Sequence, residues 1–437
     1  MNIVQTFRNA WKVAELRRKI LFTLFIILIF RLGVAIPVPF LDKVALSNMF
    51  KDVPGNGGFL SYLDMISGGS FSQSTLFALS VTPYINASII IQLLAYALPP
   101  LERLQKEGPE GRKKLNKITR YVSLVIALIL SFAYYATLKS QGAVKEFKGF
   151  YGIFAMIVII LCFTAGASLI QWLGDQINEH GIGNGISIIL FAGIIGRMPV
   201  QIYNLWEQAN TTQKYIYIPV VLIIFICMVG FIILMNEAER RIPIQYAKRV
   251  VGRKMYGGQN SNIPVKVAMS GVMPIIFAMS FMSIPQTLSF FWKPADNPEG
   301  VWQKFYAGFV NLFNYTSLFY ALVYFLLIVG FNYFYVAMQY NPVQIANDLR
   351  QNNGGIPGIR PGRPTSDFIK RVLSKITLVG AFFLGVIAIF PIFFQMATGV
   401  QIAMGGTSIL IVVGVALETV RTLESQMMMR HHKGFLE

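Results

Sequence analysis

The chain has 437 residues, of which 54% are hydrophobic and 13% are charged, and its formal net charge is +18. Soluble globular proteins carry roughly 25% charged residues, so this composition excludes an ordinary soluble domain and predicts a membrane protein. The two cysteines, Cys162 and Cys227, each lie within an apolar run, and the three histidines are His180, His431 and His432. Neither residue type clusters as a disulfide framework or a metal site requires, so we expect no metal and no cofactor.

Uncharged runs long enough to cross a bilayer, which takes about 20 mostly apolar residues, recur along the whole chain. The first run follows a basic stretch. Because it is long and no small-residue cleavage site follows it, we interpret it as a retained span. Counting the runs predicts an all-α polytopic membrane protein with ten transmembrane helices. In chain order the spans are Ile20–Pro39, one within Met65–Leu101, Tyr121–Leu138, Gly149–Gly174, Gly181–Gly196, Tyr215–Asn236, Val267–Trp292, Ser317–Met338, and two within Ile376–Leu417 with a turn near Thr398–Gly406.

The loops between these spans differ in their content of lysine and arginine. If the N-terminus is on the inner side, most of the 38 lysine and arginine residues fall in inner loops. Positively charged loops stay in the cytoplasm, so we expect both termini to be cytoplasmic. One expected inner loop, Asp175–His180, has no lysine or arginine.

Two of the inner loops, 237–266 and 340–375, are much longer than a connection between helices requires. In the first, Ile242, Ile244 and Tyr246 alternate with polar residues before a glycine-containing stretch, which predicts a small β-hairpin. Basic loops of this kind can serve only as orientation signals that also contact anionic lipid. Their length favours a second interpretation, a docking platform for a cytoplasmic partner.

The centres of the predicted spans carry no ionisable residue, and Arg31, near the outer end of the first span, could extend to the interface. Ion-coupled transporters usually keep such residues, so a solute or lipid transporter is the weaker alternative. An intramembrane enzyme is also disfavoured, because no known catalytic motif is present. The polar side chains within the spans are neutral, and we expect most of them to form hydrogen bonds between helices. They are Asn86, Gln92, Gln171, Asn184 and Thr407.

One outer segment, Gly55–Ser74, is rich in glycine and contains a short helical pattern at Phe59–Ile66. A segment that re-enters the membrane is tolerated only where it lines a cavity or is buried in protein. The segment is therefore either a surface loop or a stretch that folds back into a pore, and the residues alone do not decide between the two.

Six stretches, in order along the chain, closely resemble the bacterial SecY family, whose members are the channel subunits of the Sec protein translocase. Together they reach from the first predicted spans to the last, so the resemblance covers nearly the whole chain. They are Val81–Gln92, Gly108–Arg112 with Thr119–Tyr121, Gly181–Ser187, Arg240–Tyr246, Pro357–Gly362 and Gly405–Ser408.

The resemblance implies a clamshell of two pseudo-symmetric inverted halves, residues 1–205 and 206–437, with a channel between them. It implies a plug near residues 57–74 that seals the channel from outside. It also implies a ring of six aliphatic side chains at the channel waist, of which two, Val81 and Leu190, depart from the isoleucine that is commoner in the family. The ring consists of Val81, Ile85, Ile186, Leu190, Ile276 and Ile411.

The resemblance further implies a lateral gate between the second and seventh spans, to which Asn86 and Gln92 are assigned only weakly. Arg360 in one inner loop, and Arg249 and Arg253 in the other, match positions that dock the SecA ATPase or the ribosome. The implied partners are SecE, SecG, SecA, the ribosome, secretory preproteins and membrane lipid. The implied location is the plasma membrane of a bacterium.

Overall fold

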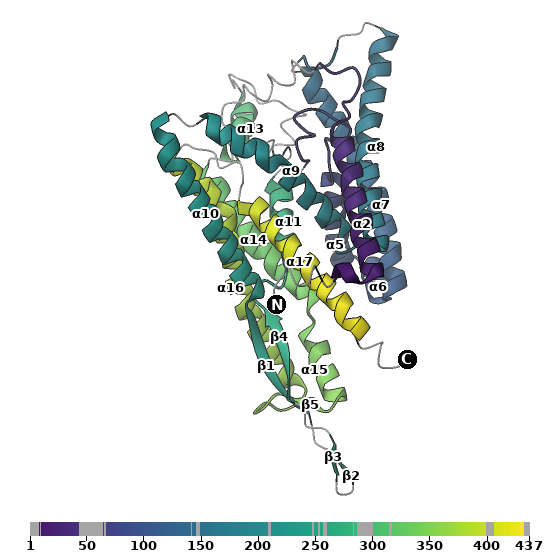
Figure 1. The fold of residues 1–437 in the computed structure, drawn as a ribbon, viewed down its shortest axis with the longest axis vertical. Helices are drawn as coiled ribbons and strands as arrows, with labels where there is room; N and C mark the ends of the chain where they lie inside the picture. Colours follow the sequence, from purple (N-terminus) through teal and green to yellow (C-terminus); the bar gives the residue numbers. More distant parts are fainter. Residues whose placement is uncertain are drawn as a thin grey trace.

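The protein is an elongated bundle of helices with a β-hairpin projecting from one end (Figure 1). The computed structural model describes residues 8, 10–42, 64, 67–140, 142–145, 149–208, 211–246, 249–251, 254–256, 260–282, 284–285, 300–313, 317–398 and 406–431. The helices are α2 (Ala14–Val34), α5 (Thr82–Ala97), α6 (Pro99–Lys106), α7 (Pro109–Ser140), α8 (Phe150–His180), α9 (Gly185–Gln208), α10 (Thr211–Glu237), α11 (Met273–Met282), α13 (Val301–Leu312), α14 (Leu318–Gln339), α15 (Pro342–Gln351), α16 (Arg363–Thr398) and α17 (Gly406–His431).

Each predicted span coincides with one described helix. By length and hydropathy alone, five helices in the described part of the chain can cross a membrane, or six if the bent pair α5–α6 is one span. The shorter apolar helices include α11 and the first part of α9. The structure therefore shows a multi-pass helical membrane fold, and the count of ten, with which it is consistent, stays a prediction.

Side chains that face outward on the bundle are largely apolar, as lipid contact requires. On α2, for example, Leu24, Phe25 and Leu28 are more than half exposed. Contiguous apolar surface of this kind would be a liability in water, whereas in a bilayer it is the surface that the acyl chains solvate.

Several helices extend well beyond the predicted spans. α7 begins at Pro109, whereas the predicted span begins at Tyr121, because lysine, arginine and glutamate remain good helix formers outside the membrane. The expectation of a loop at Asp175–His180 was wrong, since these residues form the last turns of α8. The turn begins at Gly181, and the Oδ1 atom of Asn184 then accepts the Ile186 backbone N–H at 3.2 Å to cap α9.

Three hydrophobic cores organise the bundle. One lies among α2, α5, α8, α9, α11 and α17, and a second lies among α10, α11, α14, α16 and α17. The third joins α7 and α8 to the residues that precede α5. Among the neutral polar side chains, Gln171 on α8 accepts a hydrogen bond from the Ser123 hydroxyl on α7 at 2.6 Å, an interhelical bond of the expected kind. The predicted boundary between residues 205 and 206 falls in the last turn of α9, and the division into two halves stays a prediction.

The predicted hairpin is confirmed. Strand β1 (Glu239–Tyr246) pairs antiparallel with β4 (Asn260–Lys266), and the short strands β2 (Arg249–Val251) and β3 (Lys254–Tyr256) pair beyond them. Ile242 and Ile244 face a core shared with α15 and α16. The strand β5 (Gly354–Gly355) adds to the free edge of β1, so the two long loops form one structure (Figure 1).

Replacing the buried Ile244 by alanine tests this packing. Ile→Ala changes in cores cost about 2–5 kcal/mol, so Ile244→Ala should loosen the sheet and speed limited proteolysis between residues 237 and 266. The matched control is Gln245→Ala, because Gln245 is the exposed next residue of the same strand. Equal proteolysis rates in the two variants would contradict the packing described here.

Candidate functional site

An apolar cluster lies where α5, α9, α11 and α17 meet. It contains five of the six predicted ring residues as buried members, each less than a tenth exposed, and the sixth, Ile85, packs against it partly buried. The buried five are Val81, Ile186, Leu190, Ile276 and Ile411. The structure thus brings together side chains separated by up to 330 positions in sequence. Their role as a pore ring stays a prediction.

Helical spacing places two pairs of these residues on common faces. Val81 is the N-cap of α5 and Ile85 follows one turn later, while Ile186 and Leu190 are one turn apart at the start of α9. Two further helix starts converge here, since Ile276 lies in the first turn of α11 and Ile411 early in α17. The cluster is therefore built from residues in the first two turns of four helices.

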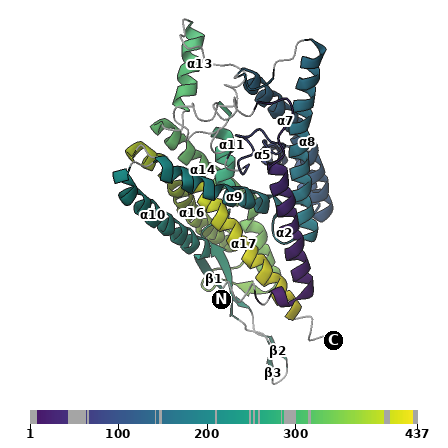
Figure 2. The same cartoon turned by 45° about the horizontal axis from the view of Figure 1, so that its top comes forward.

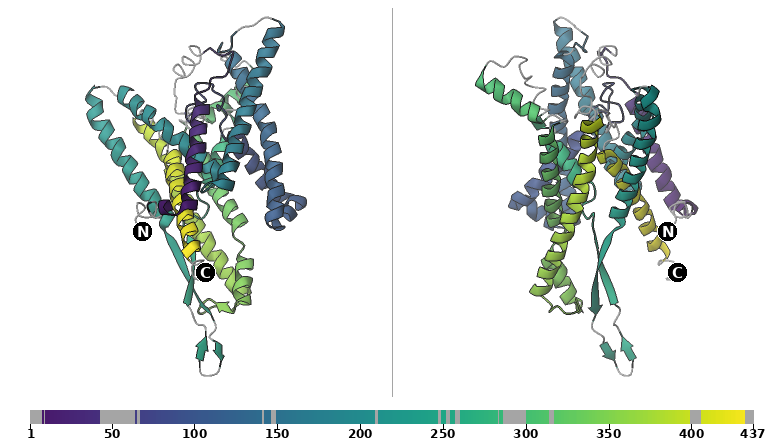
Figure 3. Two further views of the ribbon diagram at one scale, coloured as in Figure 1. Left: turned by 45° about the vertical axis from the view of Figure 1, so that its right-hand side comes forward. Right: turned by 90° about the vertical axis from the view of Figure 1, so that its left-hand side faces the viewer.

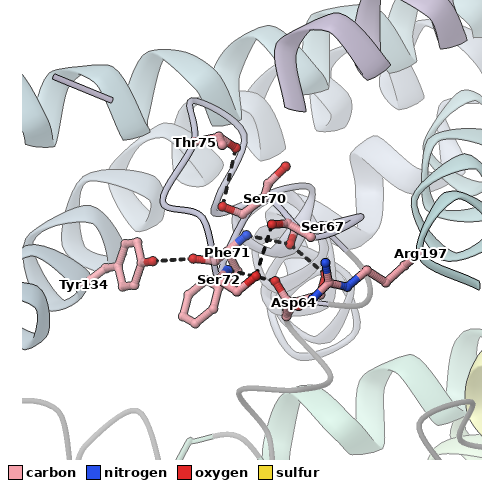
Figure 4. Close-up of polar contacts among 9 residues, drawn as sticks. Asp64, Ser67, Ser70, Phe71, Ser72, Thr75, Tyr134 and Arg197 are labelled. Atoms are coloured by element: carbon pink, nitrogen blue, oxygen red, sulfur yellow. Dashed lines mark hydrogen bonds and ion pairs between the residues drawn. The ribbon is translucent and has the colours of Figure 1, made fainter. Parts of the chain in front are cut away.

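The irregular segment 67–80 is packed among α2, α7, α8 and α9. Most of its residues are buried, including Ser67, Ser70, Phe71, Ser74 and Phe77. Its backbone forms turns rather than a helix, with Leu76 N–H donating to the Ile36 carbonyl at 2.9 Å. Buried irregular backbone needs polar partners, and Figure 4 shows side chains that supply them. The predicted plug spans residues 57–74, of which only Asp64 and 67–74 are among the described residues, so most of the Phe59–Ile66 pattern lies outside them.

Asp64 is the centre of this polar network. Its Oδ2 atom lies 2.6 Å from Nη2 of Arg197 on α9, and its Oδ1 atom accepts the Ser72 backbone N–H at 2.7 Å. The side chains of Asp64 and Arg197 are 10% and 21% exposed, so the pair is shielded from water on most sides. In such surroundings a charge that lost its partner would carry a large desolvation penalty. The pair therefore ties the segment to α9.

Tyr134 on α7 holds the other side of the segment. Its hydroxyl donates to the Phe71 carbonyl at 2.6 Å and lies 2.6 Å from the Ser74 hydroxyl. Because a carbonyl only accepts, the single phenol proton goes to Phe71, and Ser74 donates to Tyr134. The Tyr134 ring also stacks on Phe71 with centroids 4.5 Å apart.

Two glycines let the segment approach α9 closely. Gly68 has φ +68° and its missing Cβ would stand 3.3 Å from the Gly193 backbone, while Gly69 has φ +92° and its Cβ would stand 2.7 Å from the Arg197 guanidinium. A side chain at either position would meet both steric contact and backbone strain.

Arg31 does not extend to the outer interface, as its position near the end of the first span led us to expect. Its Nη2 atom donates to the Ala192 carbonyl on α9, and its guanidinium lies where a Cβ on Gly196 would be. The guanidinium therefore turns toward α9 and is held there by this hydrogen bond. Sequence reasoning missed the roles of Asp64, Arg197 and Tyr134, whose only signals were charges or a phenol next to apolar runs.

The two weakly assigned gate residues lie on α5. The Oδ1 of Asn86 and the Oε1 of Gln92 are buried and have no hydrogen-bond partner in the described part of the chain. Gln92 Nε2 donates to Ser88 Oγ at 3.1 Å, within its own helix. Gln92 borders a cavity of about 400 Å³ that is lined by residues of α5, α6, α7 and α14, such as Tyr335, and α11 contributes none.

The structure describes the three predicted docking residues, Arg360, Arg249 and Arg253, to different extents. Arg360 is exposed in the connection between α15 and α16, where Gly358 and Gly362 have positive φ and the Arg360 carbonyl accepts the Thr365 hydroxyl at 2.8 Å. Arg253 lies outside the described residues, and only the backbone of Arg249 is described.

At the base of the hairpin, burial lowers the pKa of Lys266. Nearby Arg421 lowers this pKa further and Glu239 opposes the shift.

Comparisons with known proteins agree with this architecture. The family model named SecY matches residues 75–420. Among curated relatives, the protein translocase subunit SecY of Streptomyces coelicolor is 40% identical over 99% of this chain and 100% of its own length. The subunit of the same name from Thermotoga maritima is 41% identical over 99% of this chain and 98% of its own length.

Solved structures share the fold at lower identity. A structure described as a protein conducting channel superposes with a TM-score of 0.63 at 16% identity, covering 94% of this chain and 92% of that one. A structure concerned with the plug domain of SecY gives a TM-score of 0.62 at 17% identity over the same shares of the two chains.

The fold defines the class of the protein as a multi-pass helical membrane protein with the architecture of that solved channel structure. More particularly, the chain belongs to the SecY family. It is therefore a multi-pass membrane protein and a translocase channel subunit.

Removing the Asp64 carboxylate tests how the buried segment is held. A hydrogen bond to a charged group contributes about 1.5–3 kcal/mol. In Asp64→Ala the Ser72 N–H loses this hydrogen bond. Amide exchange at Ser72, measured by hydrogen–deuterium exchange, should therefore accelerate by about ten- to a hundredfold. Arg197→Ala should have a similar effect, and the two changes combined should not be additive.

The control for this experiment is Gln73→Ala, which alters an exposed side chain in the same segment and should leave exchange unchanged. Additive effects of Asp64→Ala and Arg197→Ala would mean that the two residues hold the segment independently rather than as a pair.

Proposed function

We propose that this chain is the protein-conducting channel of the bacterial general secretory pathway. It passes unfolded preproteins across the plasma membrane and releases hydrophobic segments sideways into lipid. The observation that carries the proposal is the convergence of Val81, Ile85, Ile186, Leu190, Ile276 and Ile411 on one apolar cluster, in a chain of the SecY family.

The chemistry of this cluster suits a pore for unfolded polypeptide. An apolar constriction disfavours water and ions by dewetting, so it limits leak while the channel rests. Aliphatic side chains can rearrange around any passing residue, since they have no hydrogen bonds to break. A ring of charges would instead bind some substrates and repel others. Val81 and Leu190 differ in shape from isoleucine but keep the apolar character on which this role depends.

The segment 67–80 supports a plug near residues 57–74. It is buried against α9, which supplies two of the ring residues, and its polar contacts are few enough to be exchanged when the channel opens. The Asp64–Arg197 pair is the strongest of these contacts, because it alone joins two opposite charges. Opening must therefore either break this pair or move α9 together with the segment.

The lateral gate is proposed to lie between α5 and α11, the second and seventh spans. These helices contact each other directly, without a described interhelical hydrogen bond from Asn86 or Gln92. An interface closed mainly by apolar contacts can be replaced by a hydrophobic signal sequence at little cost. The unpaired Asn86 Oδ1 would serve as a polar contact for the arriving segment, whereas Gln92 is the weaker candidate because no residue of α11 lines the cavity that it borders.

The joined cytoplasmic loops support docking of the SecA ATPase and the ribosome. The sheet β4–β1–β5 links the hairpin to the connection that carries Arg360, so one partner can engage both loops. The basic residues suit phosphate contacts with ribosomal RNA. In this proposal SecE and SecG complete the membrane complex, and energy comes from the partner, so the chain itself is not an enzyme and needs no cofactor.

We place both termini in the cytoplasm. The start of α2 and the end of α17 lie at the end of the bundle that carries the hairpin (Figure 1), and Leu16 and Leu423 pack in one small core there. The uneven distribution of lysine and arginine supports assigning this end to the cytoplasm.

Enlarging the apolar waist should increase resting ion leak. Ile85→Gly, Ile276→Gly and Ile411→Gly, combined in one variant, should raise resting conductance severalfold in planar bilayers, because the widened constriction admits water. The lipid-facing changes Leu28→Gly and Ile226→Gly are the control. An unchanged conductance in the triple variant would argue against the ring assignment.

Charge reversal at Arg360 tests docking. Arg360→Glu should abolish ATP-dependent import of a secretory precursor into liposomes that contain the chain with SecE and SecA. Expression and SecE binding should stay intact, since the side chain is exposed. Arg363→Glu, three residues on and also exposed, is the matched control. Normal import by the Arg360 variant would overturn the docking role.

A further inference from the structure

The helix α13 (Val301–Leu312), in the connection between α11 and α14, has one apolar face and one polar face. On a helical projection the apolar residues occupy one half of the circumference, and the other half carries small or polar residues with a single charge, Lys304. The apolar half consists of Val301, Trp302, Phe305, Tyr306, Phe309, Val310 and Leu312.

Within the described part of the chain, this apolar face is largely uncovered. Trp302 is 77% exposed and Phe305 65% exposed, and Phe309 and Leu312 are also exposed. Trp302 and Phe305 stack on one another with centroids 6.0 Å apart, which presents a continuous aromatic surface. A helix that was packed against the bundle would bury such residues, so α13 has a partner outside the described chain.

The orientation of α13 differs from that of the membrane-spanning helices. In the right-hand view of Figure 3, α13 projects sideways from the bundle, whereas α14 and α16 run along its length. The tilted view of Figure 2 confirms the direction, because α13 is foreshortened in Figure 1 and extended in Figure 2. The helix lies at the end of the bundle opposite the hairpin, across the direction of the spans.

Aromatic contacts hold the end of α13 where α14 begins. Phe309 lies 4.9 Å from Phe313, and Phe313 lies 5.8 Å from Phe319, the second residue of α14. From that point α14 presents an exposed apolar surface that includes Leu318 and Leu322. The apolar face of α13 is therefore continuous in the chain with a lipid-facing surface and begins at the level where that surface ends.

We propose that α13 is an interfacial helix that lies on the outer surface of the bilayer. Its tryptophan and phenylalanine side chains enter the boundary between acyl chains and headgroups, and its polar half, with Lys304, faces headgroups and water. Tryptophan favours this boundary, and helices with one aromatic face and one polar face lie in the plane of the membrane. A lipid surface needs no shaped pocket, which suits a face made mainly of aromatic and aliphatic side chains.

The position of the helix gives this contact a consequence for gating. α13 belongs to the connection between α11, a proposed gate helix, and α14. Anchoring the connection at the membrane surface fixes the depth of its outer end while α11 moves. The interfacial contact itself does not depend on the pore, gate or docking assignments, so its failure would leave the proposed function intact.

Site-directed fluorescence quenching tests the contact. Single cysteines are placed at Trp302→Cys and Phe305→Cys on the apolar half and at Gln303→Cys and Lys304→Cys on the polar half, in a chain carrying Cys162→Ala and Cys227→Ala. All four sites are exposed, so no core contact is lost. The channel, with a fluorescent label on its single cysteine, is reconstituted in vesicles. In one arm the vesicles contain lipids spin-labelled high on the acyl chain. In the other arm iodide is present on both sides of the membrane.

We expect labels at 302 and 305 to be quenched severalfold more by spin-labelled lipid, and severalfold less by iodide, than labels at 303 and 304. Equal iodide quenching at all four sites would overturn the proposal, because the helix would stand in water. Protection of 302 and 305 from both quenchers would also overturn it, because a protein partner would then cover the face.

Discussion

The architecture depends on one constraint, that backbone N–H and C=O groups inside a bilayer must find partners within the protein. Helices satisfy it automatically, and nearly all of the membrane-spanning chain is helical. The segment 67–80 satisfies it differently, through Asp64, Tyr134 and the Ile36 carbonyl. This segment can therefore remain irregular while it is packed among α2, α7, α8 and α9, and it can be released from them without unwinding a helix.

The proposed waist and the segment 67–80 beside it are held by different kinds of contact. In the proposed channel, the waist is closed by aliphatic side chains that lack directional bonds, which suits opening and resealing around any sequence. The segment is held by directional bonds, of which the Asp64–Arg197 pair joins it to α9. Because α9 also carries Ile186 and Leu190, we expect movement of this one helix to affect both the proposed seal and the segment.

Much of the fold followed from local patterns. Each described helix that is long and apolar enough to cross a membrane falls on a predicted uncharged run, because hydropathy acts residue by residue, and the alternation of Ile242 and Ile244 located the hairpin. Helix ends were less accurate, since α7 and α8 continue past the charges that bounded their predicted spans. The ring residues were found only by resemblance, because aliphatic residues four apart are common in membrane helices and spacing alone does not distinguish them.

By itself the sequence determined the membrane class, the helical segments, the basic loops and the family, since these depend on composition and on neighbours along the chain. Only the tertiary structure decided which distant residues meet. Asp64 and Arg197 are 133 positions apart, Arg31 turns inward to the Ala192 carbonyl, and Gly354–Gly355 joins the edge of β1. Such contacts depend on how the helices pack and on which distant segments of the chain become neighbours, and no local sequence pattern encodes either.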